Sequence, residues 1–265
     1  MPSVRVNNVD IAYDDRGSGD GPPLLLVHGF PLDKRMWEPQ VQALTGEFRI
    51  ITADLRGHGE SQVTPGPYTM DLLADDLKGL MDALSLQSVV LGGFSMGGYA
   101  VFSFYRKYPE RVHSLMLLDT RPQPDSDDAK KGREDMAQLA EREGAGPIAE
   151  RLIPRLLAPD TVANRQDVVD KVRTMITQCP VEGIAGDLRG MALREDSSDL
   201  LSKIDVPTLI VVGDQDAITP PAESHMMASI INGATVVEVS GSGHLSNLEN
   251  PDEFNHAIHD FLHPH

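Results

Sequence analysis

The sequence predicts an α/β fold, with a mostly parallel central sheet flanked by helices and a helical cap inserted between two strands. Three observations predict it. Short apolar runs alternate with helical stretches, these runs are hydrophobic at consecutive positions, and one long stretch contains helices alone. Continuous hydrophobicity indicates burial on both faces, as in a parallel sheet covered by helices. We therefore expect a core domain, residues 1–120 and 204–265, and a cap, residues 121–203.

The strands follow from the apolar runs. Asn7 and Asn8, residue types common in tight turns, join two short strands expected at residues 4–6 and 11–13. The remaining runs are bounded by turn residues and are expected to form the parallel part of the sheet. They cover residues 24–27, 50–53, 89–91, 115–118, 209–212 and 236–239.

Helices are expected between these strands, for example at residues 70–84 and 95–107. Pro251 is expected to begin the last helix, because proline is tolerated in the first turn, and this helix runs to about residue 262.

The stretch from residue 121 to 203 carries no convincing strand. An insertion between two parallel strands lies above the carboxyl edge of the sheet, where α/β proteins bind ligands, so we interpret it as a cap. A helical dimerisation arm is the alternative. Under either interpretation, the helices of residues 121–203 are expected at residues 127–142, 148–157, 166–178 and 181–193.

Composition excludes several function classes. With 40 acidic and 23 basic side chains, the net charge is −17, which argues against nucleic acid and anionic membranes as partners. Cys179 is the only cysteine, which suits a reducing compartment, and the first residues lack the apolar core of a signal peptide. We therefore expect a cytoplasmic protein. Residues 83–105 carry no charge, but their glycines fit a buried strand and helix better than a membrane span.

The most informative motif is Gly93-Phe94-Ser95-Met96-Gly97, a G-x-S-x-G sequence between an expected strand and an expected helix. This setting is typical of a nucleophile elbow, in which a strained turn exposes the serine hydroxyl. Glycines flank the serine because the turn leaves no room for side chains. The helix N-terminus offers amide donors where an oxyanion would form. A Gly/Ser-rich turn that matches by chance is the alternative, and the strand and helix around the motif argue against it.

A serine nucleophile needs a base, and position selects His244 among nine histidines. His244 follows the last expected strand, on a glycine-bearing loop at the carboxyl edge of the sheet. His28 and His58 lie in glycine-bearing loops that they are expected to brace. The other histidines precede a strand, fall in a helix or lie in or after the C-terminal helix: His113, His225, His256, His259, His263 and His265.

The acid that orients the imidazole is expected after an earlier strand. Asp214 and Asp216 both follow residues 209–212. Asp214 lies nearer the strand and is expected to brace the loop. Asp216 lies further from the strand along the loop, so we favour it as the orienting acid. Asp119, at the end of the strand before the cap, is a weaker rival.

These motifs resemble the α/β-hydrolase superfamily along essentially the whole chain, including its chain order of nucleophile, acid and base. Further matches occur at residues 26–31, 54–61, 213–216, 243–244 and 249–251. Within the superfamily, the chain is similar to small bacterial carboxylesterases related to 3-oxoadipate enol-lactonases. The resemblance implies an α/β-hydrolase fold and an oxyanion hole formed by the backbone N–H groups of Phe30 and Met96.

We therefore expect a serine carboxylesterase that hydrolyses small, uncharged, short-chain esters with water through an acyl-enzyme, using Ser95, His244 and Asp216. The side chains of Phe30, Trp37 and Met96 are expected to line the substrate pocket, although Trp37 and the methionines also fit an ordinary core. No metal-ligand spacing or dinucleotide motif occurs, so we expect no metal and no cofactor.

Three other functions use the same motifs. Lactone hydrolysis, as by the 3-oxoadipate enol-lactonases, is the nearest alternative. An anionic lactone would need a cationic anchor, for which the candidates are Arg121, Arg133, Arg189 and Arg194. Cofactor-free perhydrolysis needs the same three residues. A non-catalytic receptor for a small ligand is the alternative outside the enzymes.

Overall fold

The computed structural model describes residues 2–263; Met1, Pro264 and His265, which the predicted domain boundaries include, lie outside the described residues. Its centre is an eight-stranded sheet with the order β1-β2-β4-β3-β5-β6-β7-β8. The strands are β1 (Ser3–Val6), β2 (Val9–Arg16), β3 (Leu24–Val27), β4 (Ile50–Ala53), β5 (Val89–Phe94), β6 (Val112–Leu118), β7 (Thr208–Gly213) and β8 (Thr235–Val239).

The pairing confirms the predicted mostly parallel sheet. β2 pairs antiparallel with β1 and β4, and β3 to β8 pair with parallel neighbours. Every residue of β3, β4, β5 and β7 is buried, which is why these strands read as continuous apolar runs in the sequence.

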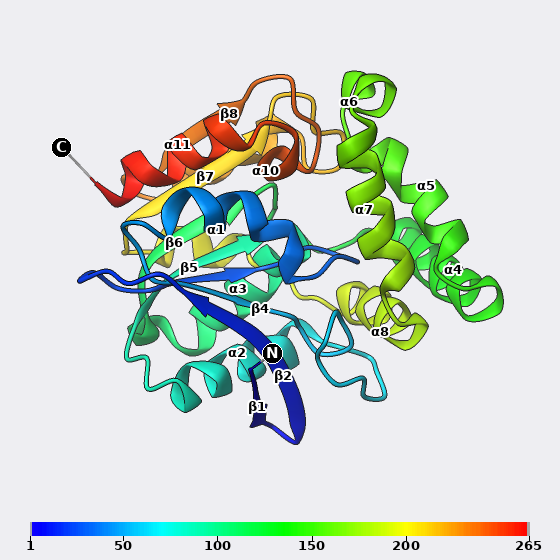
Figure 1. The fold of residues 1–265 in the computed structure, drawn as a ribbon, viewed down its shortest axis with the longest axis horizontal. Coiled ribbons are helices and arrows are strands. Elements are labelled where there is room, and N and C mark those ends of the chain that lie inside the picture. The colour runs from blue at the N-terminus through cyan, green and yellow to red at the C-terminus, as the bar shows by residue number, and fades with distance from the viewer. Residues whose placement is uncertain (1, 264–265) are drawn as a thin grey trace.

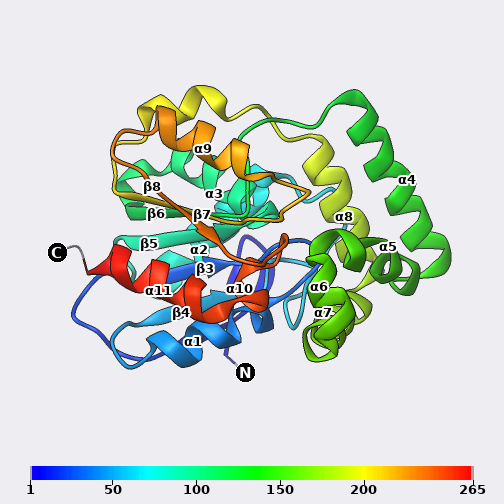
Figure 2. The same cartoon turned by 90° about the horizontal axis from the view of Figure 1, so that it is seen from above.

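Helices cover both faces of the sheet (Figure 2). On one face lie α2 (Met70–Ala83), α3 (Met96–Lys107) and α9 (Pro221–Ile230). On the other lie α1 (Glu38–Leu44) and α11 (Pro251–Leu262), with the short α10 (Ser246–Glu249) before α11. Short 3-10 helices occur at η1 (Lys34–Trp37), η2 (Pro109–Arg111) and η3 (Ser198–Lys203).

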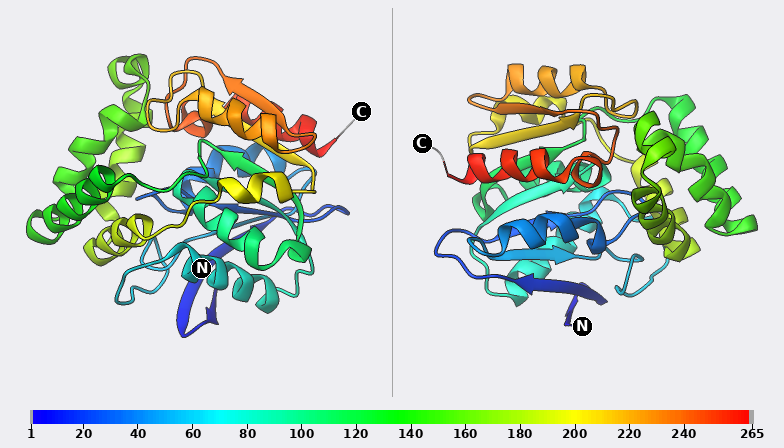
Figure 3. Two further views of the ribbon diagram at one scale, coloured as in Figure 1. Left: turned by 180° about the vertical axis from the view of Figure 1, so that it is seen from behind. Right: turned by 45° about the horizontal axis from the view of Figure 1, so that its top comes forward.

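A group of helices between β6 and β7 stands to one side of the sheet (Figure 1). It consists of α4 (Asp127–Glu143), α5 (Gly146–Leu156), α6 (Pro159–Asn164), α7 (Gln166–Gln178) and α8 (Val181–Ala192). Figure 3 shows the same separation from two further directions. We call α4–α8 the helical insertion. The sequence predicted four of its helices and missed the short α6.

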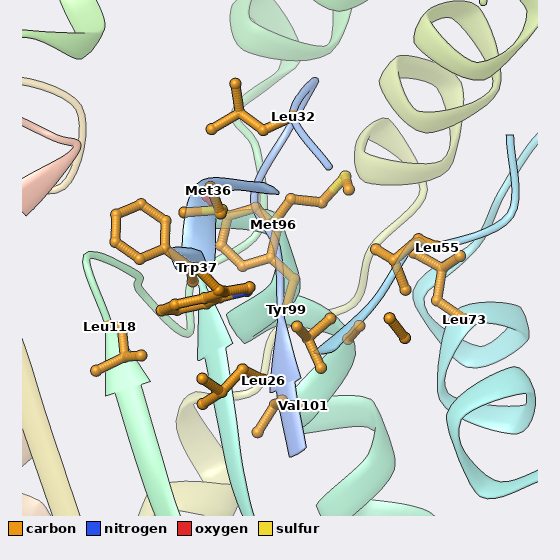
Figure 4. Close-up of a cluster of buried hydrophobic side chains, with 14 of the residues drawn as sticks. Leu26, Leu32, Met36, Trp37, Leu55, Leu73, Met96, Tyr99, Val101 and Leu118 are labelled. Carbon is orange, nitrogen blue, oxygen red and sulfur yellow. The ribbon is translucent and has the colours of Figure 1, made fainter. Parts of the chain in front are cut away.

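The core lies between the sheet and the helices of its two faces. Figure 4 shows part of it, with Trp37 and Met96 among side chains from the sheet and α3. Trp37 is fully buried and its ring centroid lies 6.0 Å from Phe94 and 6.5 Å from Phe254. Within residues 2–263, no helix is both long enough and apolar enough to span a membrane.

Candidate active site

Ser95 occupies the sharp turn between β5 and α3. Its backbone has φ 51° and ψ −112°, a strained conformation for a residue with a side chain. The turn is anchored by a hydrogen bond of 2.8 Å from Ser95 N–H to the Leu118 carbonyl. A Cβ at Gly93 would lie 2.5 Å from the Gly97 carbonyl oxygen, and one at Gly97 would lie 2.5 Å from that of Val27. The two glycines are therefore required by close backbone contacts.

A chain of short hydrogen bonds joins Ser95, His244 and Asp216. Ser95 Oγ lies 2.7 Å from His244 Nε2, and His244 Nδ1 lies 2.7 Å from Asp216 Oδ2. A carboxylate only accepts, so Nδ1 carries the proton that it donates to Asp216. Nε2 is then free to accept the Ser95 hydroxyl proton. The structure thus brings together the three residues that the sequence selected.

Asp216 is held as an ionised acceptor. Its Oδ1 accepts backbone N–H groups of Ile218 and Thr219 at 2.7 and 3.0 Å, and its Oδ2 accepts the Thr219 hydroxyl at 2.6 Å. Burial raises the pKa of Asp216, but His244 and these hydrogen bonds outweigh it and hold the pKa below its usual value. The sequence analysis missed the role of Thr219, although it directly follows Ile218 in the loop after Asp216.

The two rival carboxylates have other partners. Asp214 accepts the Ser242 backbone N–H at 3.1 Å, so it braces the loop that carries His244. Asp119 is fully buried and accepts the Gly213 N–H at 2.9 Å and the Ser246 hydroxyl at 2.5 Å. Burial, reinforced by the nearby charge of Asp216, raises the pKa of Asp119 well above its usual value.

The loop of His244 is also tied to the helical insertion. Glu249 accepts the Gly243 N–H at 2.9 Å through Oε1 and the Ala158 N–H at 2.8 Å through Oε2. In addition, Leu245 N–H donates to the Leu156 carbonyl at 3.1 Å. The end of α5 and the imidazole loop are therefore held together.

The backbone amides beside Ser95 suit an oxyanion. A Cβ at Gly29 would lie 3.3 Å from Ser95 Cβ, so the loop after β3, in which Phe30 directly follows Gly29, contacts the serine. Met96 is the first residue of α3, where helical N–H groups have no partner within the helix. Among the described residues, neither amide donates to a carbonyl in a turn, loop or cap.

A cavity of about 510 Å³ opens above Ser95 and His244. Its walls come from the core and from helices of the insertion, and most are apolar. They include Phe30, Tyr99, Met136, Leu152, Leu188 and Ile218. A volume of this size suits a small organic ligand.

A family model described as the alpha/beta hydrolase fold matches residues 22–251. The chain belongs to the α/β-hydrolase family. It is 29% identical over 256 residues to 3-oxoadipate enol-lactonase 2 of Acinetobacter baylyi, which covers 97% of this chain and 94% of that protein. This confirms the predicted relation to enol-lactonases.

Solved structures extend the comparison. A thermophilic esterase from Thermogutta terrifontis, solved with malate bound, is 46% identical, with a TM-score of 0.96 over 99% of this chain and 98% of that one. An enol-lactonase from Burkholderia xenovorans is 31% identical, with a TM-score of 0.92 over 99% of this chain and 100% of that one.

Of the three side chains predicted to line the substrate pocket of this α/β hydrolase, one lies at the cavity and two lie in the core. Phe30 lines the cavity. Trp37 and Met96 were also predicted to line it, but neither is among its lining residues, and both side chains pack in the core. Their hydrophobicity indicated burial, but an apolar pocket wall and a core position have the same sequence signal.

Of the predicted cationic anchors, two face the cavity of the hydrolase. Arg121 and Arg133 line it, whereas Arg194 is not among the lining residues and pairs with Asp125 at 2.8 Å. Arg189 instead forms ion pairs with Glu134 and Glu141 on the surface of α4. Arg155, which the sequence analysis did not select, also lines the cavity.

The remaining histidines of the hydrolase have structural or surface positions. His28 Nε2 accepts the Leu55 N–H at 2.9 Å, and burial together with the charge of His58 lowers the pKa of His28 to about 4. His58 Nδ1 contacts the Arg56 carbonyl at 3.1 Å, so both histidines brace their loops. His113 lies within β6 rather than before it. The others within residues 2–263 are partly or fully exposed: His225, His256, His259 and His263.

Within the part of the chain that the structure describes, two groups of side chains have ligand atoms close enough to share a metal ion. They are Glu47 with His259 and His263, at the surface, and Asp119 with Asp216 and His244, in the site. The atoms of the second group are already engaged in the hydrogen bonds described above. Those bonds suit proton transfer between serine and imidazole.

Proposed function

We propose that the protein is a serine hydrolase that cleaves small carboxylic esters through an acyl-enzyme. The observation that carries this proposal is the chain of hydrogen bonds Ser95–His244–Asp216 at a strained turn that opens into a cavity. The esterase from Thermogutta terrifontis, 46% identical over nearly the whole chain, supports the ester as substrate.

In the first step, Ser95 Oγ attacks the acyl carbon while its proton passes to His244 Nε2. The imidazolium that forms is stabilised by the ionised Asp216, which also holds Nδ1 as the protonated nitrogen. His244 then gives its proton to the departing alcohol oxygen, and the C–O bond of the ester breaks. The acyl group remains bound to Ser95.

The charge that develops on the carbonyl oxygen needs donors that are already in place. We propose the N–H groups of Phe30 and Met96 for this task. In comparable enzymes one such donor is worth roughly 3 kcal/mol of transition-state stabilisation. A water molecule, deprotonated by His244, then attacks the acyl group and releases the acid.

Lactone hydrolysis is the second candidate, and the similarity to enol-lactonases over the full chain favours it. A lactone is a cyclic ester, so the same steps apply, except that the alcohol remains attached to the acyl group. The size and polarity of the cavity, not the three reacting side chains, would then decide between the two substrates.

A hydrolysis screen of nitrophenyl esters with increasing acyl length, alongside lactones of increasing ring size, tests the proposal. We expect turnover of short acyl esters and loss of about 10³-fold or more in kcat for Ser95→Ala, with an unchanged circular dichroism spectrum and melting temperature. The series also tests the predicted preference for uncharged, short chains. A folded Ser95→Ala variant with substantial activity would refute the proposal.

A further inference from the structure

The wall of the cavity carries more positive than negative charge. Three guanidinium groups line it, those of Arg121, Arg133 and Arg155, but only one carboxylate, that of Asp125. This is unusual in a chain of net charge −17. The excess of positive charge at the cavity therefore results from where these arginines lie and not from the overall composition.

The ion pairs around Asp125 do not balance this charge. Asp125 pairs with Arg133, with Arg194 at 2.8 Å and more distantly with Arg121 at 3.9 Å. Arg121 has a further partner in Glu223 at 3.3 Å. Three guanidinium groups thus share two carboxylates, and one positive charge is left over. The Nε of Arg121 is buried without a hydrogen-bond partner.

Arg155 adds a second unmatched charge. It is an exposed residue of α5, and among residues 2–263 no carboxylate lies within ion-pair distance of it. The next residue, Leu156, accepts the N–H of Leu245 at 3.1 Å, which fixes this end of α5 beside His244. Arg155 therefore lines the same cavity as Ser95 and His244.

We propose that the cavity binds a carboxylate carried by the substrate, with Arg155 as its main partner and the Arg121–Arg133 side adding positive potential. A guanidinium presents parallel N–H donors that match both oxygens of a carboxylate. The substrate class is then an ester or lactone with an anionic group away from the scissile bond. The sequence analysis expected uncharged esters; the arginines on this wall favour anionic ones. This inference rests on the proposed function.

The test compares two nitrophenyl esters of the same shape. One is the monoester of a straight six-carbon dicarboxylic acid, with its far carboxylate free; in the other, an isopropyl group replaces that carboxylate. Rates of the uncatalysed reactions are subtracted. We expect Arg155→Gln to lower kcat/KM for the anionic ester about tenfold or more and for the neutral ester less than about twofold.

Arg151→Gln is the matched control, because Arg151 is an exposed arginine one turn earlier on α5 that does not line the cavity. It should leave both rates unchanged. The carboxylate site would be overturned if Arg155→Gln lowered kcat/KM equally for the two esters or lowered it for neither. It would also be overturned if Arg151→Gln showed the same selective loss for the anionic ester. Hydrolysis of the neutral ester, and its loss in Ser95→Ala, reports on the proposed function separately.

Discussion

The carboxylates of Asp119 and Asp216 both lie near the imidazole of His244, and hydrogen bonds decide which of the two orients it. Ligand atoms of Asp119, Asp216 and His244 lie within 4.8 Å of one another. Of these two carboxylates, Asp216 is the one hydrogen-bonded to His244 Nδ1, and its pKa is lowered, whereas burial and the charge of Asp216 raise the pKa of Asp119. Like charges this close do not ionise equally easily, so the pKa values of the two carboxyl groups move in opposite directions.

Replacing each carboxylate tests this division. Asp216→Asn should lower kcat by about 10³- to 10⁴-fold, because an amide no longer fixes the proton on Nδ1. Asp214→Asn, a matched change two residues away, should cost only a few-fold, because Asp214 contacts the Ser242 backbone. Steady-state rates on one ester decide the matter. If Asp119→Asn were the most damaging of the three changes, the orienting acid would be Asp119.

Asp119→Asn should instead stabilise the protein at neutral pH. The folded state raises the pKa of Asp119, so the carboxyl's contribution to stability is present below its ordinary pKa of 3.8 and is lost as pH rises above it. Asparagine stays neutral, accepts the Gly213 N–H through Oδ1, donates from Nδ2 to the Ser246 hydroxyl oxygen and tolerates φ 45°. We expect a gain in the free energy of unfolding of about 1 kcal/mol or more at pH 7.

Urea unfolding of wild type and Asp119→Asn between pH 4 and pH 8 measures this gain. The difference should grow with pH and shrink towards zero near the ordinary carboxyl pKa of about 4. A difference that does not change with pH would show that Asp119 is as ionised in the folded state as in the unfolded one.

At the scale of elements, a buried pair fastens α8 of the insertion to the loop after β4. His58 Nε2 lies 3.1 Å from Asp187 Oδ2, and both side chains are fully buried. Burial lowers the pKa of His58, but Cys179 and Asp187 outweigh it and raise that pKa well above its usual value. A Cβ at Gly183 would lie 2.1 Å from the Gly57 carbonyl oxygen, so the two backbones touch beside the pair.

Breaking this pair from one side should be costly. His58→Gln leaves the Asp187 carboxylate buried without a counter-charge, and we expect a loss of about 3–5 kcal/mol in the free energy of unfolding. The double variant His58→Gln/Asp187→Asn, which has no charge at either position of this pair, should be more stable than the sum of the single losses implies. Chemical denaturation of the four proteins gives the coupling. Strict additivity would mean that α8 is held by packing alone.

The elements themselves were largely predictable from sequence, for reasons that differ along the chain. β3 and β5 are apolar at every position because helices cover both faces, and Ser95 has its strand, turn and helix in one short segment. The short α6 was missed because it has only six residues, too few for a periodic pattern. Trp37 was misplaced because sequence hydrophobicity does not distinguish a core position against Phe94 and Phe254 from a pocket wall.

At the scale of the whole molecule, the chain carries its charge unevenly. Acidic groups dominate overall, yet arginines from α4, α5 and the segment before the insertion line one cavity. Arg155 and Ser95 are 60 residues apart in sequence and line the same wall only because α5 is tied to the loop of His244. Such a site depends on how the insertion packs on the core, which no local pattern in the sequence reveals.

The central claim is that Ser95 is the nucleophile that carries the acyl group, and covalent trapping tests it most directly. The protein is treated with a fluorophosphonate, which reacts with activated serine hydroxyls, and the adduct is located by intact-mass and peptide mass spectrometry. The account predicts one adduct per chain, on Ser95, and its loss in both Ser95→Ala and His244→Gln. An adduct on another residue, or no adduct on a protein that hydrolyses esters, would contradict it.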